Sequence, residues 1–241
     1  MTGVELVPFN DYNSLKELFE QKGDLIASFM VEPIQGEAGV KLAQKNYLKG
    51  VENLCKKNKI LFMLDEIQVG LGRTGRLYCH EHFNIKPDII CLAKGLGGGL
   101  PCGAILAKLK IADFLTPGSH GTTMGGNPLA MTAGLASFNQ TKKATFLKEV
   151  EKKGKYFLDE LKKMKKNKSV KEVRGLGLIL AIEFHFEDFA KQFSQKCIKK
   201  GLLIILTEKF NIRILPPLNV KINEIRKSIE IFNSVFDEAN E

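Results

Sequence analysis

The chain has 241 residues, of which 44% are hydrophobic and 26% are charged. This composition is close to the globular average and excludes a disordered, collagenous or disulfide-scaffold protein. No apolar run approaches the roughly 18 residues that a membrane-spanning helix needs, and the start of the chain lacks the basic and apolar regions of a signal peptide. We therefore expect a cytoplasmic protein that does not bind membranes.

The net charge of +9 comes mostly from one segment, residues 139–171, which contains twelve lysines against four acidic residues. Apolar side chains recur there at helical spacing between Leu147 and Met164, so the lysines cover the remaining faces of an amphipathic helix. The segment contains no arginine for bidentate contacts and few aromatic residues on its polar side. We expect a solvated helix face and no nucleic-acid partner.

Apolar runs alternate with helical stretches in the first half of the chain, as in a parallel sheet built from strand–helix–strand units. Buried parallel strands form continuous apolar runs of this kind. A further helix is predicted to begin at Asn127 and Pro128, because Asn caps the first amides and Pro suits the first turn. The predicted strands are 25–31, 60–64, 89–93 and 103–107, and the predicted helices are 47–57 and 127–138.

A second pattern follows the lysine-rich helix. Its predicted strands are 170–174, 178–184, 202–206 and 212–215, and its predicted helices are 187–200 and 223–236. This order indicates a small α+β domain. We therefore predict an α/β protein with two parts: residues 1–139 belong to a large domain with a mostly parallel sheet, and residues 140–241 form the small domain.

Three predicted strands are followed by polar residues, namely Glu32, Asp65 and Lys94. In open α/β sheets ligands bind outside the carboxyl ends of the strands, so these residues are expected at one edge. Spacing alone is equally consistent with a plain ion pair at that edge.

Other kinds of site fit less well. Residues 60–66 resemble the magnesium-binding strand of a nucleoside triphosphatase, but no Gly-rich phosphate loop precedes them. The glycines in 95–99 lack dinucleotide-binding spacing. His80 and His82 do not share a helix face, so we predict no metal site. For the arginines at 73 and 76 we expect surface or subunit contacts.

The pairing of Asp65 with Lys94 suits pyridoxal phosphate (PLP). This cofactor needs a lysine to form a Schiff base and a carboxylate to keep its pyridine nitrogen protonated. Gln68 could donate to the phenolic oxygen of the ring, and the glycines after Lys94 would let the backbone pass close to a flat ring.

Long motifs carry a resemblance to a known family. They are VEPIQGEAGV (31–40), LDEIQVGLGRTG (64–75), LAKGLGGGLP (92–101), HGTTMGGNPL (120–129), VRGLGL (173–178) and IRILPPL (212–218). In order and spacing they resemble the class III PLP-dependent aminotransferases. The resemblance covers nearly the whole chain and implies the PLP-dependent transferase fold of type I.

Carried over position by position, the resemblance implies roles for individual residues. Lys94 would be the Schiff-base lysine, Asp65 the partner of the pyridinium and Gln68 the contact to the phenolic oxygen. Thr123 matches a threonine that reaches the cofactor phosphate of the other subunit in a homodimer. The remaining two matches concern the substrate: Arg213 would bind a substrate carboxylate, and Glu37 would pair with Arg213 and swing away when the dicarboxylic partner binds.

The implied reaction is ping-pong transamination, with amino-acid and 2-oxo-acid substrates. The residues of the motifs, those of 92–101 above all, favour N-acetylornithine as amino donor and 2-oxoglutarate as amino acceptor, as in arginine biosynthesis. Ornithine or another ω-amino acid is the alternative donor. Relatives carry further N-terminal elements of the active site that this sequence does not contain. We therefore also keep the alternative of an inactive PLP-binding or interaction protein.

Overall fold

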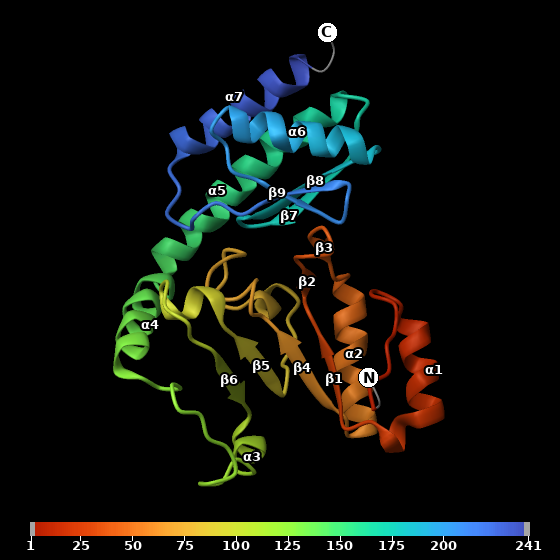
Figure 1. Ribbon diagram of the computed structural model, residues 1–241. Helices are drawn as coiled ribbons and strands as arrows, with labels where there is room; N and C mark the ends of the chain where they lie inside the picture. Colours follow the sequence, from red (N-terminus) through yellow and green to blue (C-terminus); the bar gives the residue numbers. More distant parts are fainter. Residues whose placement is uncertain (1–2, 239–241) are drawn as a thin grey trace. The chain divides into compact units, whose positions relative to one another are not determined.

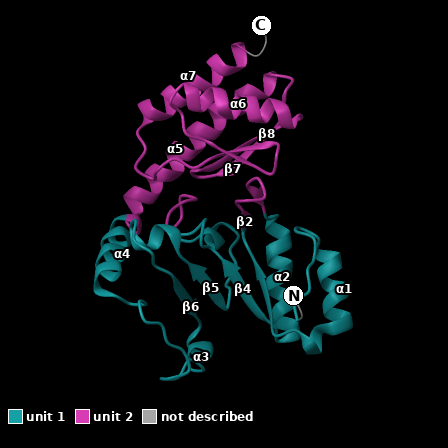
Figure 2. Ribbon diagram, viewed as in Figure 1, with its two compact units in different colours: residues 1–33, 43–70, 78–140 teal, residues 34–42, 71–77, 141–241 magenta. Residues whose placement is uncertain are grey.

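The computed structural model describes residues 3–238, which form two compact units. Figure 2 shows them in different colours. Of the described residues, 3–33, 43–70 and 78–140 belong to unit 1, and 34–42, 71–77 and 141–238 belong to unit 2. Within the described residues, no helix has the length and apolar character needed to cross a membrane. The predicted division into domains at residues 139 and 140 stays a prediction, because compactness alone does not show that a unit folds independently.

Unit 1 is built on a four-stranded sheet with the order β1-β4-β5-β6 (Figure 1). Its elements are α1 (Tyr12–Lys22), β1 (Ser28–Val31), α2 (Lys45–Asn58), β4 (Leu61–Asp65), β5 (Ile89–Leu92), β6 (Ala104–Ala107), α3 (Leu109–Ala112) and α4 (Pro128–Thr141). β1, β4 and β5 run parallel, as predicted. The apolar side of α2, including Leu48 and Val51, is completely buried, and α2 packs on β4 and α1.

The fourth strand runs opposite to the other three, so the sheet is mostly parallel, as predicted, and not wholly parallel. β6 pairs antiparallel with β5, with Ile89 opposite Ala107. The chain between β5 and β6 is a short Gly-rich loop without a crossover helix, and a parallel connection needs a crossover of a dozen or more residues. The predicted start of α4 is confirmed, because Asn127 Oδ1 accepts a hydrogen bond from the amide of Ala130 at 2.9 Å.

Unit 2 contains an antiparallel sheet with the order β7-β8-β10-β9 and a separate two-stranded hairpin, β2–β3. Its elements are β2 (Ile34–Gln35), β3 (Lys41–Leu42), α5 (Ala144–Lys163), β7 (Val170–Leu176), β8 (Ile179–Phe184), α6 (Glu187–Lys199), β9 (Ile205–Thr207), β10 (Asn211–Ile214) and α7 (Ile222–Asp237). The predicted strands and helices of this part agree with these elements within a few residues. The β2–β3 hairpin was not predicted, because its strands have two residues each.

The helices α5, α6 and α7 pack on one face of this sheet and enclose a single apolar cluster. In α5, Val150, Phe157 and Leu161 face this cluster, and the lysines of the helix are exposed or half-buried. Residue 73 departs from expectation. Arg73 is half-buried, its Nη1 donates to the carbonyls of Leu178 and Pro216, and burial lowers its pKa to about 10.

Candidate active site

The carboxyl ends of three parallel strands place Glu32, Asp65 and Lys94 along one edge of the unit 1 sheet. Val31 pairs with Leu64, and Asp65 pairs with Cys91. Glu32 and Lys94 therefore follow strands β1 and β5, which lie on either side of the strand that ends in Asp65. The expected gathering of these residues at one edge is confirmed.

Asp65 is held by a tight turn at the end of β4. Its Oδ1 accepts a hydrogen bond from the amide of Ile67 at 2.9 Å, which is the local bond that Asp commonly makes in turns. Within residues 3–238, the Asp65 carboxylate accepts this hydrogen bond through Oδ1. Its second oxygen, Oδ2, can accept a hydrogen bond from a donor such as a pyridinium N–H. Gln68 lies in the same turn and is half-buried.

Lys94 opens a short 3-10 helix, Lys94–Gly97, and has a φ of 44°. A positive φ is uncommon for a residue with a side chain, and strain of this kind is found most often at functional sites. The backbone around Lys94 is supported by α4. Ser137 Oγ donates to the carbonyl of Gly95 at 3.2 Å, and a Cβ at Gly134 would lie 3.0 Å from the carbonyl oxygen of Leu96. The absence of a side chain at Gly134 lets α4 approach this segment closely.

Thr123 lies in an exposed segment between α3 and α4. The contacts found within residues 3–238 do not join it to Asp65 or Lys94. Its predicted role concerns a second subunit, so the position of Thr123 in one chain does not test that role. The donor set on the sheet edge fits PLP: a carboxylate and a lysine end neighbouring strands, and an amide lies in the turn between them.

A buried carboxylate next to Asp65 was missed by sequence reasoning. The Glu66 side chain is fully buried and accepts hydrogen bonds from the amides of Cys79 and His80, at 2.6 and 2.8 Å. It also lies 2.8 Å from Nδ1 of His80. Glu66 thus links the end of β4 to residues 79 and 80, and it supports the turn that carries Asp65 and Gln68. Only its position directly after Asp65 in the motif could have indicated this role.

Unit 2 contains the other two predicted site residues. Arg213 lies on β10 with its side chain 7% exposed, and its Nη1 is 2.5 Å from Oε1 of Glu37. Glu37 lies in the β2–β3 hairpin and is 72% exposed. The expected ion pair is therefore present in the structure, and its two members differ greatly in exposure.

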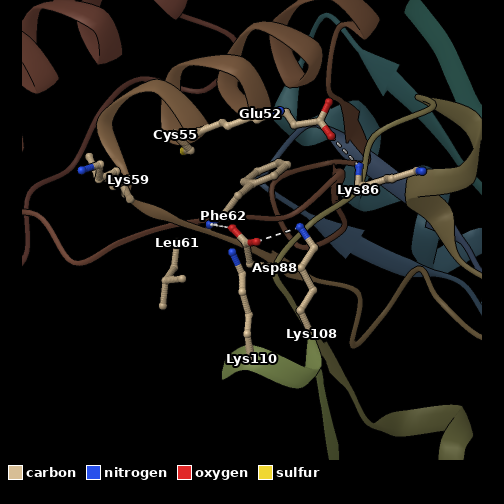
Figure 3. A pocket seen from close by; sticks show the side chains of 11 residues that line it. Glu52, Cys55, Lys59, Leu61, Phe62, Lys86, Asp88, Lys108 and Lys110 are labelled. Carbon is tan, nitrogen blue, oxygen red and sulfur yellow. Dashed lines mark hydrogen bonds and ion pairs between the residues drawn. The ribbon is translucent and has the colours of Figure 1, made fainter. Parts of the chain in front are cut away.

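A pocket of about 420 Å³ lies in unit 1 at the amino ends of β4 and β5, the opposite end of the sheet from Asp65 (Figure 3). None of the predicted site residues lines it. Five lysines line it, together with Asp88. The Asp88 carboxylate accepts from the amide of Phe62 at 2.9 Å and from Nζ of Lys108 at 2.8 Å (Figure 3). Because the Lys108 amide also donates to the Asp88 carbonyl, Asp88 connects β4, β5 and β6.

Asp88 leads to a prediction about pH. Partial burial raises the pKa of its carboxyl, but the hydrogen bonds from Lys108 and Phe62 and the charges of Lys108 and Lys110 outweigh burial and lower it below 3.8. The stabilisation is therefore present above pH 3.8 and is lost as the pH falls through the lower pKa of the folded state. Asp88→Asn should lower the free energy of unfolding by about 1 kcal/mol at pH 7 and by less as the pH approaches 3.

Urea unfolding at a series of pH values would measure this difference. Asp113→Asn serves as the control, because Asp113 is exposed. A difference between wild type and Asp88→Asn that stays constant from pH 7 to pH 3 would contradict the expectation.

The chain is similar to known proteins over nearly its whole length. The family model for class III aminotransferases matches residues 6–236. The acetylornithine aminotransferase of Caldanaerobacter subterraneus subsp. tengcongensis is 46% identical over 239 residues, which are 99% of this chain and 60% of that protein. The chain thus spans about 60% of the length of this curated relative.

Two solved structures have the same fold. The acetylornithine aminotransferase from Elizabethkingia anophelis matches with a TM-score of 0.91 and 37% identity over 96% of this chain and 59% of that chain. The ornithine aminotransferase from Toxoplasma gondii matches with a TM-score of 0.92 and 35% identity over 100% of this chain and 58% of that chain. That structure is described as having partial occupancy of PLP at the active site. The type I transferase fold predicted from the sequence is confirmed, and the chain belongs to the class III aminotransferase family.

Proposed function

We propose that this chain carries the part of a PLP-dependent aminotransferase site that contains the cofactor-binding lysine, Lys94. The proposed reaction transfers the δ-amino group of N-acetylornithine to 2-oxoglutarate. The observation that carries the proposal is the placement of Asp65 and Lys94 at the carboxyl ends of neighbouring parallel strands. The names of the acetylornithine aminotransferases that resemble the chain support this choice of donor. In this role the protein would act in arginine biosynthesis.

Four residues would hold the cofactor. Lys94 would bind it covalently, Asp65 would face its pyridine nitrogen and Gln68 its phenolic oxygen, and Thr123 would reach the phosphate of the cofactor in the other subunit of a homodimer. When bound, PLP supplies an electron sink for the negative charge that develops on the substrate carbon.

The residues of the chain would then move protons and orient the substrate. The Lys94 amine, once released by the incoming substrate amine, would take the proton from the substrate carbon as general base and would deliver it to the cofactor as general acid. The negative charge of Asp65 would favour protonation of the ring nitrogen of the cofactor. Arg213 would bind a carboxylate of the dicarboxylic substrate in its planar fork after Glu37 moves away.

Ornithine is the second candidate donor, because the ornithine aminotransferase from Toxoplasma gondii matches this chain with a TM-score of 0.92. Spectral titration with PLP tests the proposal. We expect a visible absorption band from lysine-bound cofactor, its loss on addition of N-acetylornithine, and its return with glutamate formation on addition of 2-oxoglutarate. A larger response to ornithine at equal concentration would select the second candidate. No visible band at all would support the alternative of an inactive protein.

A further inference from the structure

One face of the unit 2 sheet brings two arginines side by side. Arg174 on β7 pairs with Ala181 on β8, and Ala181 pairs with Arg213 on β10. Side chains of directly opposed residues lie on the same face of an antiparallel sheet. Both guanidinium groups therefore leave the same face, and the small side chain of Ala181 lies between them.

The next row on this face fixes the orientation of Arg174. Glu172 and Asn211 both pair with Glu183 and lie two residues along their strands from the arginines. Nη1 of Arg174 donates to Glu172 at 2.7 Å and to Glu183 at 2.5 Å, and its Nη2 donates to Oδ1 of Asn211 at 2.6 Å. With its side chain only 11% exposed, Arg174 is held in a single direction by the sheet.

The same guanidinium group binds the backbone of the β2–β3 hairpin. Nε and Nη2 of Arg174 donate to the carbonyl of Gly39, at 2.9 and 2.6 Å. Gly39 has a φ of 86°, and a Cβ there would lie 2.7 Å from the side chain of Asn211. The hairpin backbone therefore lies directly against the sheet, two residues after Glu37.

Glu37 itself is not held by burial. Its side chain is 72% exposed, and its partner Arg213 is 7% exposed. Exposed ion pairs contribute little by themselves, because water and salt screen them and ordering the side chains costs entropy. The hairpin that carries Glu37 therefore contributes to its position, and Arg174 binds that hairpin at Gly39.

We propose that Arg174 is a positioning residue that holds the carbonyl of Gly39, so that Glu37 shields Arg213 from carboxylates until the dicarboxylic substrate displaces it. The link to carboxylate binding rests on the proposed function. The anchoring of the hairpin by Arg174 does not, and it can be tested separately.

Replacing Arg174 should change the KM values of the two substrates in opposite directions. Without a firmly held Glu37, Arg213 no longer has to be uncovered, so the KM for 2-oxoglutarate should fall by about threefold, within the range of an exposed charge pair. The uncovered Arg213 would also attract the carboxylate of the amino donor in a non-productive pose, so the KM for the donor should rise. A merely structural defect would weaken the binding of both substrates.

Arg174→Lys is the main test, since lysine keeps the charge but cannot hold the Gly39 carbonyl and three side-chain acceptors with one planar fork. We would measure amide hydrogen exchange of residues 36–42 in the full chain and both KM values in the holoenzyme. We expect faster exchange in the hairpin and the opposite shifts in KM. Arg76→Lys is the matched control, because it makes the same change at an exposed arginine of unit 2 and should leave the hairpin exchange and both KM values unchanged.

Arg174→Ala is the second variant and should give the same signs with larger effects if it folds. Unchanged hairpin exchange in Arg174→Lys would overturn the proposal, as would a rise in both KM values. Faster exchange without transamination by the wild-type protein would leave the anchoring role intact and reject the proposed function instead.

Discussion

Replacing Lys94 by alanine is expected to remove the visible absorption band of bound PLP and to lower the rate of transamination by at least about 100-fold. The lysine is the group that would bind the cofactor covalently, and loss of a positioned general base or acid alone costs roughly 10²- to 10⁴-fold. The fold should survive, because Lys94 is exposed. Absorption spectra of the purified variant with added PLP, together with a single-turnover assay with the amino donor, would measure both effects.

Lys57→Ala is a suitable control for this variant, because Lys57 is an exposed lysine on α2 in the same unit. It should retain the spectrum and the rate of the wild type. A Lys94→Ala variant with an unchanged visible band would reject Lys94 as the cofactor lysine, and with it the function proposed for this edge of the sheet.

The largest loss of stability is expected for Phe193→Ala in α6. The Phe193 side chain is 1% exposed, and its ring centroid lies 5.1 Å from that of Phe184, 5.7 Å from that of Phe232 and 4.8 Å from that of Phe236. Truncation would leave a cavity at the centre of the apolar cluster of unit 2. Such changes usually cost about 3 to 5 kcal/mol, because the surrounding side chains relax only in part.

Chemical unfolding followed by circular dichroism would measure this loss. Phe186→Ala removes the same side chain at an exposed position just before α6, where 66% of the residue is accessible, and should cost less than about 1 kcal/mol. A loss at Phe193 as small as that at Phe186 would contradict the central position of Phe193 in the core. If Phe193→Ala is too unstable to purify, Phe193→Leu should show a smaller loss in the same direction.

Hydrophobic patterning predicted most elements of both units. Continuous apolar runs such as 60–64 indicated buried strands, and helical spacing indicated helices such as α5. The direction of β6 could not be predicted in this way, because an apolar run has the same pattern in a parallel and in an antiparallel strand. The length of the connection before β6 is the feature that decides its direction.

The β2–β3 hairpin shows a second limit. Residues 34–42 precede the predicted boundary by about a hundred positions, and nothing in their hydrophobic pattern assigns them to unit 2. Contacts with residues far along the chain make that assignment: Arg174 binds the carbonyl of Gly39, and Asn211 packs against its backbone. Contacts of this kind depend on strand pairing, which local sequence does not encode.

By itself, the sequence determined the family, the places of Asp65 and Lys94 after neighbouring strands, and the one segment that makes the chain basic. It could do so because the motifs and the apolar periodicity are local. Only the tertiary structure decided that Glu66 is a buried support of the Asp65 turn, that Asp88 joins three strands, and that Arg174 holds the hairpin of Glu37. These roles arise from burial and hydrogen bonds between residues distant in the chain, where the same Glu, Asp or Arg would otherwise be read as a solvated surface charge.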